Sequence, residues 1–357
     1  MAAALAVAEG HEVVGVTLRL WDNQDTSGCC SVAEIDDARR VAGQIGIDHR
    51  VWSFTDDFET HVVAPYAEAH AGGLTPNPCI ECNRHLKFGR FLDRALQLGF
   101  DGVVTGHHAR ILESEDGRRR LLRGVDPGKD QSYVLYVLCQ DQLVCCRFPV
   151  GDLTKAEVRV RAGELGLATA EKPDSQDACF VTSSGGRSAL LGTRIGLHPG
   201  RVVDPAGAVL GAVEAVELVT VGQRRGLGIG ASGGGERLYA LAVDTVSATV
   251  VAGVRGDLLA DAVAVGGLSW VGGGSVSGLV EAQVSAHGLA VVARLEPSAP
   301  TAESAQPFVN VVWSDRQRRV APGQSVVFYR GAEVLGGGIA LGGGPACSGS
   351  LSGAGSP

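Results

Sequence analysis

Two cysteines in the segment TPNPCIECN have the spacing and the setting for thiol chemistry. Cys79 and Cys82 form a Cys-x-x-Cys pair in a loop that leads into an expected helix, which places Cys82 beside the helix N-terminus. The positive end of the helix dipole and the free backbone N–H groups favour a thiolate there. Arg84, His85 and Lys87 add positive charge. The segment predicts a reactive thiol, with a structural zinc half-site as the alternative, although no second pair with zinc spacing accompanies it.

Two further segments carry weaker signals. Cys179 in KPDSQDACF precedes an apolar run, which by itself is more typical of a buried structural cysteine. The run TGHH follows an expected strand, and ligands bind outside the carboxyl ends of the strands in open α/β sheets. Gly106 would then let a nucleotide approach the backbone, and His107 would contact a substrate.

Two polar segments lie further along the chain. Lys129, Asp130 and Gln131 precede an apolar stretch, either as a helix start that Asp130 caps or as a contact site. The glycines of VGQRRGLGIG lack the spacing and the βαβ context of a dinucleotide fingerprint. Arg224 and Arg225 would instead meet phosphates from a hairpin or loop.

The elements that must position these residues alternate in type. Val-rich runs predict strands at 11–20 and 49–54, and amphipathic runs predict helices at 32–47 and 57–70. A third helix is expected to begin with Asn83 as its cap and to end at Gly99. Alternating strands and helices indicate βαβ units with a parallel sheet, whereas short Val-rich runs broken by Gly and Pro after about residue 197 indicate β-barrel or sandwich modules.

Composition supports a division of this kind. The chain has 357 residues, a net charge of −8 and 45% hydrophobic residues, which suggests two or three globular domains and excludes fibrous or wholly disordered proteins. Of its 51 glycines, 34 lie from residue 185 onward. No apolar stretch is long enough to cross a bilayer, and the N-terminus does not resemble a signal peptide, so we expect a cytosolic protein with no membrane partner. The acidic balance argues against indiscriminate nucleic-acid binding.

In combination and in this order, these segments resemble the bacterial tRNA-specific 2-thiouridylase family of the PP-loop ATP pyrophosphatase group. The specific motifs are TPNPCIECNRHLKFG, TGHHAR, RLLRGVDPGKDQSYVLY, FPVGDLTKAEVR, KPDSQDACF, VGQRRGLGIG and PGQSVVFYRG with LGGGIA. The resemblance implies an α/β fold: a parallel-sheet PP-loop (adenine nucleotide alpha-hydrolase-like) domain, then a small central β-rich domain and a C-terminal β-barrel. We expect these at 1–187, 188–255 and 256–345, with a disordered tail at 346–357.

The resemblance also implies the reaction. ATP, with Mg²⁺, adenylates O2 of the wobble uridine of Gln, Lys and Glu tRNAs, and a cysteine persulfide then delivers sulfur. A sulfur-relay carrier or a cysteine desulfurase is the implied sulfur donor. Cys82 maps to the nucleophile and Cys179 to the persulfide carrier, with a disulfide forming between them. Leu18 and Gly106 map to ATP contacts, and the implied tRNA contacts are Asn77, Pro78, Cys79, His107, Lys129, Asp130, Gln131 and Gln324.

The sequence departs from the family at its start, where the S-G-G-x-D-S-S loop that cradles the ATP pyrophosphate is absent. Either the start site lies further upstream or the chain is a truncated relic, and as written it should adenylate poorly. Cys79 also stands where some relatives carry an acidic residue.

Two alternatives to the ATP-dependent sulfurtransferase remain open. One is an iron–sulfur-dependent thiolase in which Cys79, Cys82 and Cys179 hold a [4Fe–4S] cluster; the leading interpretation itself assigns no metal ligand. The other is a protein that binds tRNA without ATP activity.

Overall fold

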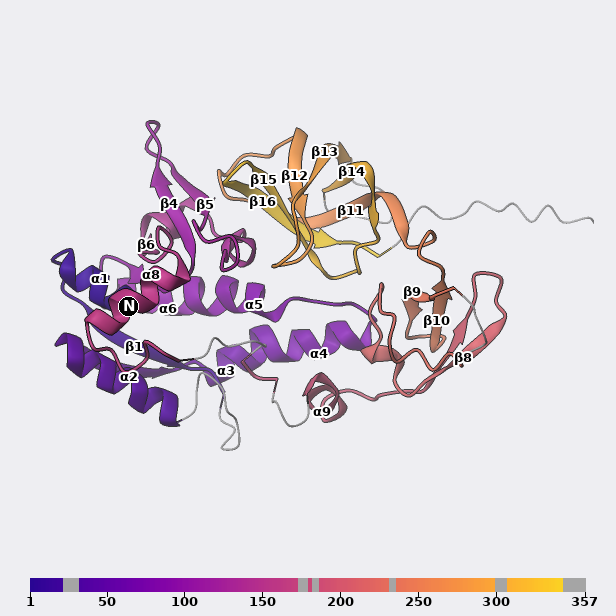
Figure 1. The fold of residues 1–357 in the computed structure, drawn as a ribbon, viewed down its shortest axis with the longest axis horizontal. Coiled ribbons are helices and arrows are strands. Elements are labelled where there is room, and N and C mark those ends of the chain that lie inside the picture. Colours follow the sequence, from indigo (N-terminus) through magenta and orange to yellow (C-terminus); the bar gives the residue numbers. More distant parts are fainter. Residues whose placement is uncertain (22–31, 173–178, 182–185, 231–235, 299–306, 343–357) are drawn as a thin grey trace, which may run out of the picture.

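The computed structural model describes residues 1–21, 32–172, 179–181, 186–230, 236–298 and 307–342. An N-terminal half with helices and parallel strands, a small central sheet and a C-terminal barrel follow one another along the chain (Figure 1). The predicted fold class is confirmed. The expected tail at 346–357 lies outside the described residues.

The N-terminal half opens with α1 (Ala2–Ala8), β1 (Val14–Arg19), α2 (Val32–Ile45) and β2 (Asp48–Ser53). Strands β1 and β2 pair in parallel, as the predicted βαβ unit requires. A second parallel pair joins β3 (Val103–Val104) to β6 (Cys146–Arg147). Among the described strands these two pairs form separate sheets rather than the continuous parallel sheet that the sequence suggested.

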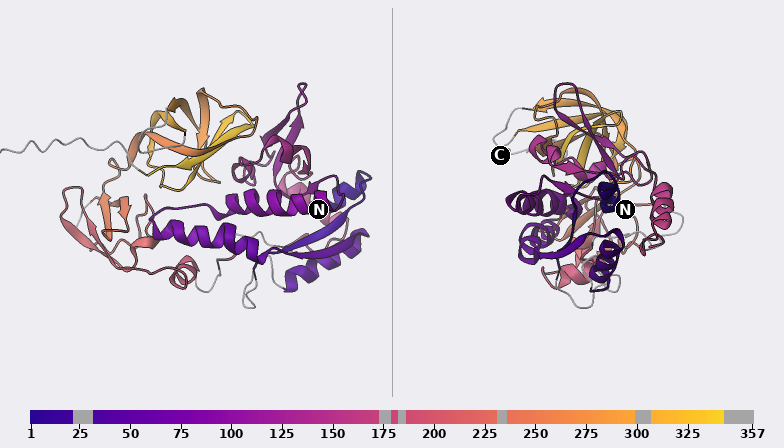
Figure 2. Two further views of the ribbon diagram at one scale, coloured as in Figure 1. Left: turned by 180° about the vertical axis from the view of Figure 1, so that it is seen from behind. Right: turned by 90° about the vertical axis from the view of Figure 1, so that its left-hand side faces the viewer.

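Two long helical segments run side by side from these strands toward the central sheet (Figures 1 and 2). The first consists of α3 (Thr55–Phe58), the π-helix η1 (Glu59–Val63) and α4 (Ala64–Ala71). The second consists of α5 (Pro78–Glu81), the π-helix η2 (Cys82–Arg90) and α6 (Phe91–Gln97). π-Helical turns are rare and occur frequently at functional sites, and the longer one begins at Cys82.

The remaining elements of this half surround the helices. The hairpin of β4 (Ala109–Glu113) and β5 (Arg119–Arg123) projects beside the barrel in Figure 1. The other segments are η3 (Ser132–Leu135), α7 (Gln140–Val144), α8 (Lys155–Glu164) and α9 (Gly186–Gly192). Within the described residues, no helix is both long and apolar enough to span a membrane.

The central sheet has the order β8–β7–β10–β9. Its strands are β7 (Gly200–Val203), β8 (Val209–Val213), β9 (Tyr239–Asp244) and β10 (Thr249–Gly253), with the short 3₁₀ helix η4 (Val216–Leu218) between β8 and β9. Val202, Val216 and Val250 are fully buried and form its core. This sheet lies at the far end of the long helices (Figure 1).

Six strands close the C-terminal barrel, because β11 pairs with both β14 and β16. They are β11 (Leu259–Trp270), β12 (Gly278–Gln283), β13 (Val291–Ser298), β14 (Phe308–Arg318), β15 (Ser325–Arg330) and β16 (Glu333–Ala340). β5 of the N-terminal half also pairs with β16, which extends the barrel sheet into the hairpin. One apolar core contains residues from both sides, including Leu121, Tyr133, Val327 and Tyr329, so the barrel is firmly packed onto the N-terminal half.

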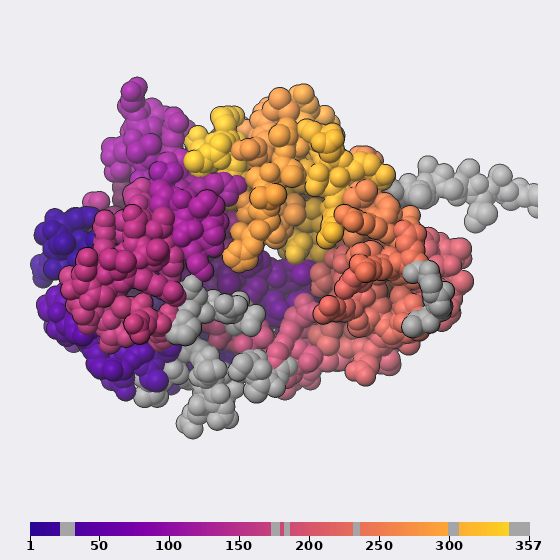
Figure 3. Space-filling view, in the orientation of Figure 1, coloured from indigo at the N-terminus to yellow at the C-terminus, as the bar shows by residue number. Residues whose placement is uncertain are grey.

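The space-filling view shows a hollow bounded by the barrel, the central sheet and the N-terminal half (Figure 3). The surface of the long helices, in purple, forms its floor. The three domains therefore face a common space over the segment that contains the predicted nucleophile.

Candidate active site

The loop that ends at Asn77 sets up the predicted nucleophile. The side-chain Oδ1 of Asn77 accepts a hydrogen bond from the backbone N–H of Cys79 at 3.0 Å, and Pro78 occupies the first helical turn. Asn77 is therefore the cap of this helix. The prediction that Asn83 is the cap is wrong, because Asn83 lies one turn inside the helix, with 1% of its surface exposed.

Cys82 and the segment of Cys179 meet in one apolar cluster. Cys82 is 7% exposed and belongs to the same core as Phe180, which directly follows Cys179. The Phe180 ring packs edge-on against Phe58 and Tyr66 of the first long helical segment, at centroid distances of 5.6 and 5.5 Å. Cys179 itself is exposed. The structure thus brings the two predicted cysteines into the same region from positions almost a hundred residues apart.

Charged side chains line the helix next to Cys82. Glu81 forms an ion pair with Arg84 at 3.3 Å, its carboxylate lies 3.3 Å from His85 Nε2, and the His85 ring stacks on His61 with the ring centroids 4.9 Å apart. Burial and the neighbouring cations lower the pKa of His85, whereas Glu81 raises it. Desolvation raises the pKa of the Cys79 thiol, and the positive charge of Lys87 opposes this shift. Cys79 is therefore mainly a neutral thiol at neutral pH.

A cavity of about 1140 Å³ separates the two parallel strand pairs. It is lined by residues 14–18 of β1 and by residues 102–107, which include β3 and the segment that follows it. Leu18, Gly106, His107 and Gln131, four of the predicted contacts, share this cavity with Lys87. A Cβ atom added at Gly106 would meet no atom within 4 Å, so the backbone there is open to a ligand.

His107 is 7% exposed and is held by a 2.8 Å hydrogen bond between its Nδ1 and the hydroxyl of Thr105. Its ring packs against Phe88 and Phe148. Burial, together with Lys87, holds its pKa well below the ordinary value, so the ring is neutral at neutral pH. Any contact that His107 makes is therefore a hydrogen bond or a stacking contact rather than an ion pair.

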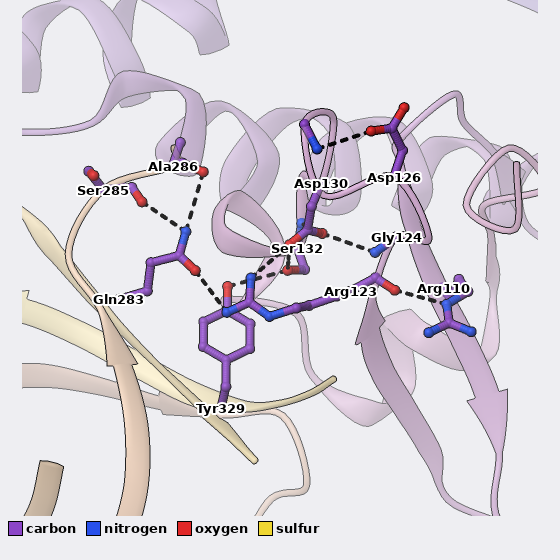
Figure 4. Close-up of polar contacts among 11 residues, drawn as sticks. Arg110, Arg123, Gly124, Asp126, Asp130, Ser132, Gln283, Ser285, Ala286 and Tyr329 are labelled. Atoms are coloured by element: carbon purple, nitrogen blue, oxygen red, sulfur yellow. Dashed lines mark hydrogen bonds and ion pairs between the residues drawn. The ribbon is translucent and has the colours of Figure 1, made fainter. Parts of the chain in front are cut away.

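Of the three residues 129–131, Asp130 points inward (Figure 4). Its side chain is 8% exposed, and its carboxylate accepts hydrogen bonds from the backbone of Gly124 and Ser132 and from the side chains of Ser132 and Arg123. Gln131 is exposed, while its side chain accepts a hydrogen bond from the backbone N–H of His108 at 3.0 Å. The loop is thus fixed at its centre.

The barrel reaches the loop before the nucleophile. The backbone N–H of Thr75 donates to Pro322 O at 2.7 Å, so the turn that carries Gln324 lies against the segment that carries Asn77. The neighbouring Ser325 accepts a hydrogen bond from Tyr133 Oη through its carbonyl at 2.8 Å. Gln324 is therefore close to the predicted base-contacting loop, although the two are almost 250 residues apart in sequence.

Tyr136 is a site residue that the sequence did not reveal. It is fully buried, its hydroxyl lies 3.2 Å from Ser325 Oγ, and it is within electrostatic reach of Arg84 and Glu81. It thereby connects the barrel to the helix of Cys82. In the sequence it is one of two tyrosines in the largely apolar run SYVLY. The one available signal is that a buried tyrosine usually finds a hydrogen-bond partner for its hydroxyl.

The zinc and iron–sulfur interpretations require converging ligands. Among the residues that the structure describes, no three His, Cys, Asp or Glu side chains are placed to hold a metal ion, and Cys79, Cys82 and Cys179 do not converge as three ligands. The six described cysteines are thiols. Asp174 and Ser175, which precede Cys179 in its motif, lie outside the described residues.

Profiles of three protein domains match consecutive parts of the chain. They are described as the tRNA methyl transferase HUP domain at residues 1–183, the tRNA methyl transferase PRC-barrel domain at 188–254 and the aminomethyltransferase beta-barrel domain at 262–340.

Curated relatives carry one common name. The tRNA-specific 2-thiouridylase MnmA of Mycobacteroides abscessus is 45% identical over 353 residues, covering 95% of this chain and 95% of the relative. The proteins of the same name from Roseiflexus castenholzii and Frankia casuarinae are 42% and 45% identical, each covering 95% of this chain and 95% and 94% of the relative, respectively. Agreement in all three domains and at this level of identity means that the chain belongs to the tRNA-specific 2-thiouridylase family.

Proposed function

We propose that this chain is an ATP-dependent sulfurtransferase that converts the wobble uridine of Gln, Lys and Glu tRNAs to 2-thiouridine. The observation that carries the proposal is the placement of Cys82 in one apolar cluster with Phe180, the neighbour of Cys179. Family membership supports action on tRNA. The nucleotide, the individual tRNAs and the roles of the two cysteines are our proposal.

In this proposal ATP occupies the cavity beside β1 and β3, with Leu18 and Gly106 against the nucleotide and Mg²⁺ on its phosphates. Adenylation turns O2 of the uridine into a leaving group. The base is extruded from the RNA stack toward Asn77, Pro78 and Cys79, because its O2 is inaccessible within stacked RNA.

Sulfur arrives as a persulfide on Cys179, supplied by a carrier protein or a cysteine desulfurase. The thiolate of Cys82 attacks the inner sulfur of that persulfide, which forms a Cys82–Cys179 disulfide and releases hydrosulfide to attack C2 of the base. AMP leaves with the former O2, and a thiol reductant restores both cysteines. Exposure of Cys179 suits delivery by another protein, and burial of Cys82 suits protection of the nucleophile from other oxidants.

Reconstitution with ATP, a persulfide donor and a cognate tRNA tests the proposal. Mass spectrometry of the digested tRNA should detect 2-thiouridine, even at a low yield, with the parent chain and none with Cys82→Ser or Cys179→Ser. Cys139→Ser is the matched control, because Cys139 is an exposed thiol outside the proposed site. Retention of product by Cys82→Ser would refute the assignment of the nucleophile.

The nucleotide site has a separate test. Gly106→Ala adds a methyl group that meets no protein atom within 4 Å, so the fold is preserved while the group projects into the cavity. We expect ATP affinity, measured by calorimetry, to fall about tenfold or more. Gly163→Ala, at an equally open helical position, should leave it unchanged. Tight ATP binding by the parent chain would count against the alternative of a tRNA-binding protein without ATP activity.

A further inference from the structure

Arg123 joins two loops from different domains (Figure 4). It lies at the end of β5, where its backbone N–H donates to Ala332 O at 2.8 Å and its carbonyl accepts from Arg110 Nε at 2.8 Å. These contacts fix its main chain between the hairpin and the barrel. The direction of the guanidinium is then set by its hydrogen bonds to Asp130 and Gln283.

The Nη1 group of the Arg123 guanidinium binds the loop of residues 124–131. Arg123 donates to Asp130 Oδ2 at 2.9 Å, and Asp130 Oδ1 accepts the backbone N–H groups of Gly124 and Ser132, each at 3.0 Å. The carboxylate therefore closes the loop on itself. On either side of Asp130, Lys129 is half-buried, and the exposed Gln131 accepts a hydrogen bond from the backbone N–H of His108 at 3.0 Å.

The Nη2 group of the guanidinium binds Gln283 at the end of β12, which holds a loop of the barrel. Arg123 donates to Gln283 Oε1 at 2.8 Å, and the Gln283 amide in turn donates to the carbonyls of Ser285 at 2.8 Å and Ala286 at 3.3 Å. Gln283 is 2% exposed, so water does not compete for these bonds. The plane of the guanidinium lies over the Tyr329 ring, 3.6 Å from its centroid, which fixes its tilt.

We propose that Arg123 is a positioning residue for RNA binding, which holds the loop of Lys129 and Gln131 in register with the barrel loop at 284–288. The inference rests on the proposed function, because it takes residues 129–131, three of the implied tRNA contacts, as part of the tRNA-binding surface. A planar fork with two separate acceptors and a stacked face explains why an arginine is needed here, since lysine offers a single point charge. Asp130 acts on RNA only through the loop that it closes.

The test compares Arg123→Lys with Lys129→Ala in tRNA binding across a range of salt concentrations. A lysine that contacts phosphate contributes to counterion release, so Lys129→Ala should reduce the salt slope by about 1. Arg123→Lys should raise the Kd about tenfold with the salt slope unchanged, because Arg123 contacts no phosphate. Gln283→Ala should give a similar loss, and the double variant with Arg123→Lys should be no weaker than either single variant.

Two controls match these variants. Arg120→Lys alters a neighbouring arginine of β5 whose contact to Glu333 is exposed and 3.8 Å long, and it should bind tRNA normally. Tyr329→Phe removes the hydroxyl near Ser132 but keeps the ring under Arg123, and it should also bind normally. An unchanged Kd in Arg123→Lys, or a salt slope reduced by 1, would overturn the inference.

Hydrogen exchange provides a readout that does not depend on tRNA. In Arg123→Lys the amides of Gly124 and Ser132 should exchange about tenfold faster, while the amides of the barrel strands keep their rates. Unchanged rates at these two amides, or faster exchange throughout the barrel, would overturn the inference. Failure of the parent chain to bind tRNA would count against the proposed function, and the two amides would then decide the role of Arg123 by themselves.

Discussion

Asn83 allows a sharp test of how the helix of the nucleophile is held. Its Nδ2 donates to the carbonyl of Val134 at 2.9 Å, which ties this helix to η3, and the side chain is 1% exposed. Its Oδ1 is buried with no hydrogen-bond partner among the described residues. The amide therefore makes a single bond in a setting where water cannot replace it.

Two substitutions at Asn83 should have different costs. Asn83→Ala removes the donor and leaves the Val134 carbonyl unsatisfied, which costs about 1–3 kcal/mol. Asn83→Asp also places a carboxylate against that carbonyl, so at pH 7 we expect a loss several kcal/mol larger than that of alanine. Burial should raise the pKa of the introduced carboxyl above its unfolded value near 4.

The destabilisation caused by Asn83→Asp should increase with pH. Below about pH 4 the introduced carboxyl is protonated in both states and can donate to Val134 O, so the penalty should disappear. As the pH rises through the raised folded pKa, the unfolded state releases its proton first and the penalty grows. Urea unfolding followed by tryptophan fluorescence measures this penalty. The free energy of unfolding of Asn83→Asp is compared with that of the parent chain at pH 4 and at pH 7. A pH-independent penalty equal to that of Asn83→Ala would refute the reasoning.

The remaining predictions concern stability elsewhere in the N-terminal half. Burial lowers the pKa of His70 to about 4, so the unfolded state takes up its proton first, and the parent chain should lose about 3 kcal/mol relative to His70→Gln between pH 7.5 and pH 4, measured by urea unfolding. Gly151→Ala should prevent folding or lower Tm by many degrees, because its Cβ would lie 1.8 Å from Ala109 O. Gly163→Ala lies within α8 with no atom within 4 Å, and it should instead stabilise the chain by about 0.5–1 kcal/mol; a loss of stability there would contradict the open geometry.

The sequence by itself determined the parts that depend on local spacing. Alternating apolar runs located α2 and β2 to within two residues, and the segment before Cys82 was enough to indicate that a helix begins there. Cys82 lies one turn inside that helix rather than beside its N-terminus, and its reactivity stays a prediction. The sequence misplaced the cap by six residues, because both Asn77 and Asn83 have the side chain that caps helices. Only the folded backbone distinguishes a free amide at the helix start from one inside the helix.

Tertiary structure decided what depends on distant residues. Packing alone placed Phe180 in one core with Cys82, brought Pro322 to Thr75, and separated the parallel strands by a large cavity. It also turned Asp130 inward onto Arg123, whereas the sequence offered it as an RNA contact or a helix cap. These pairings depend on chain topology and on which buried polar groups find partners, and short-range periodicity carries no information about either.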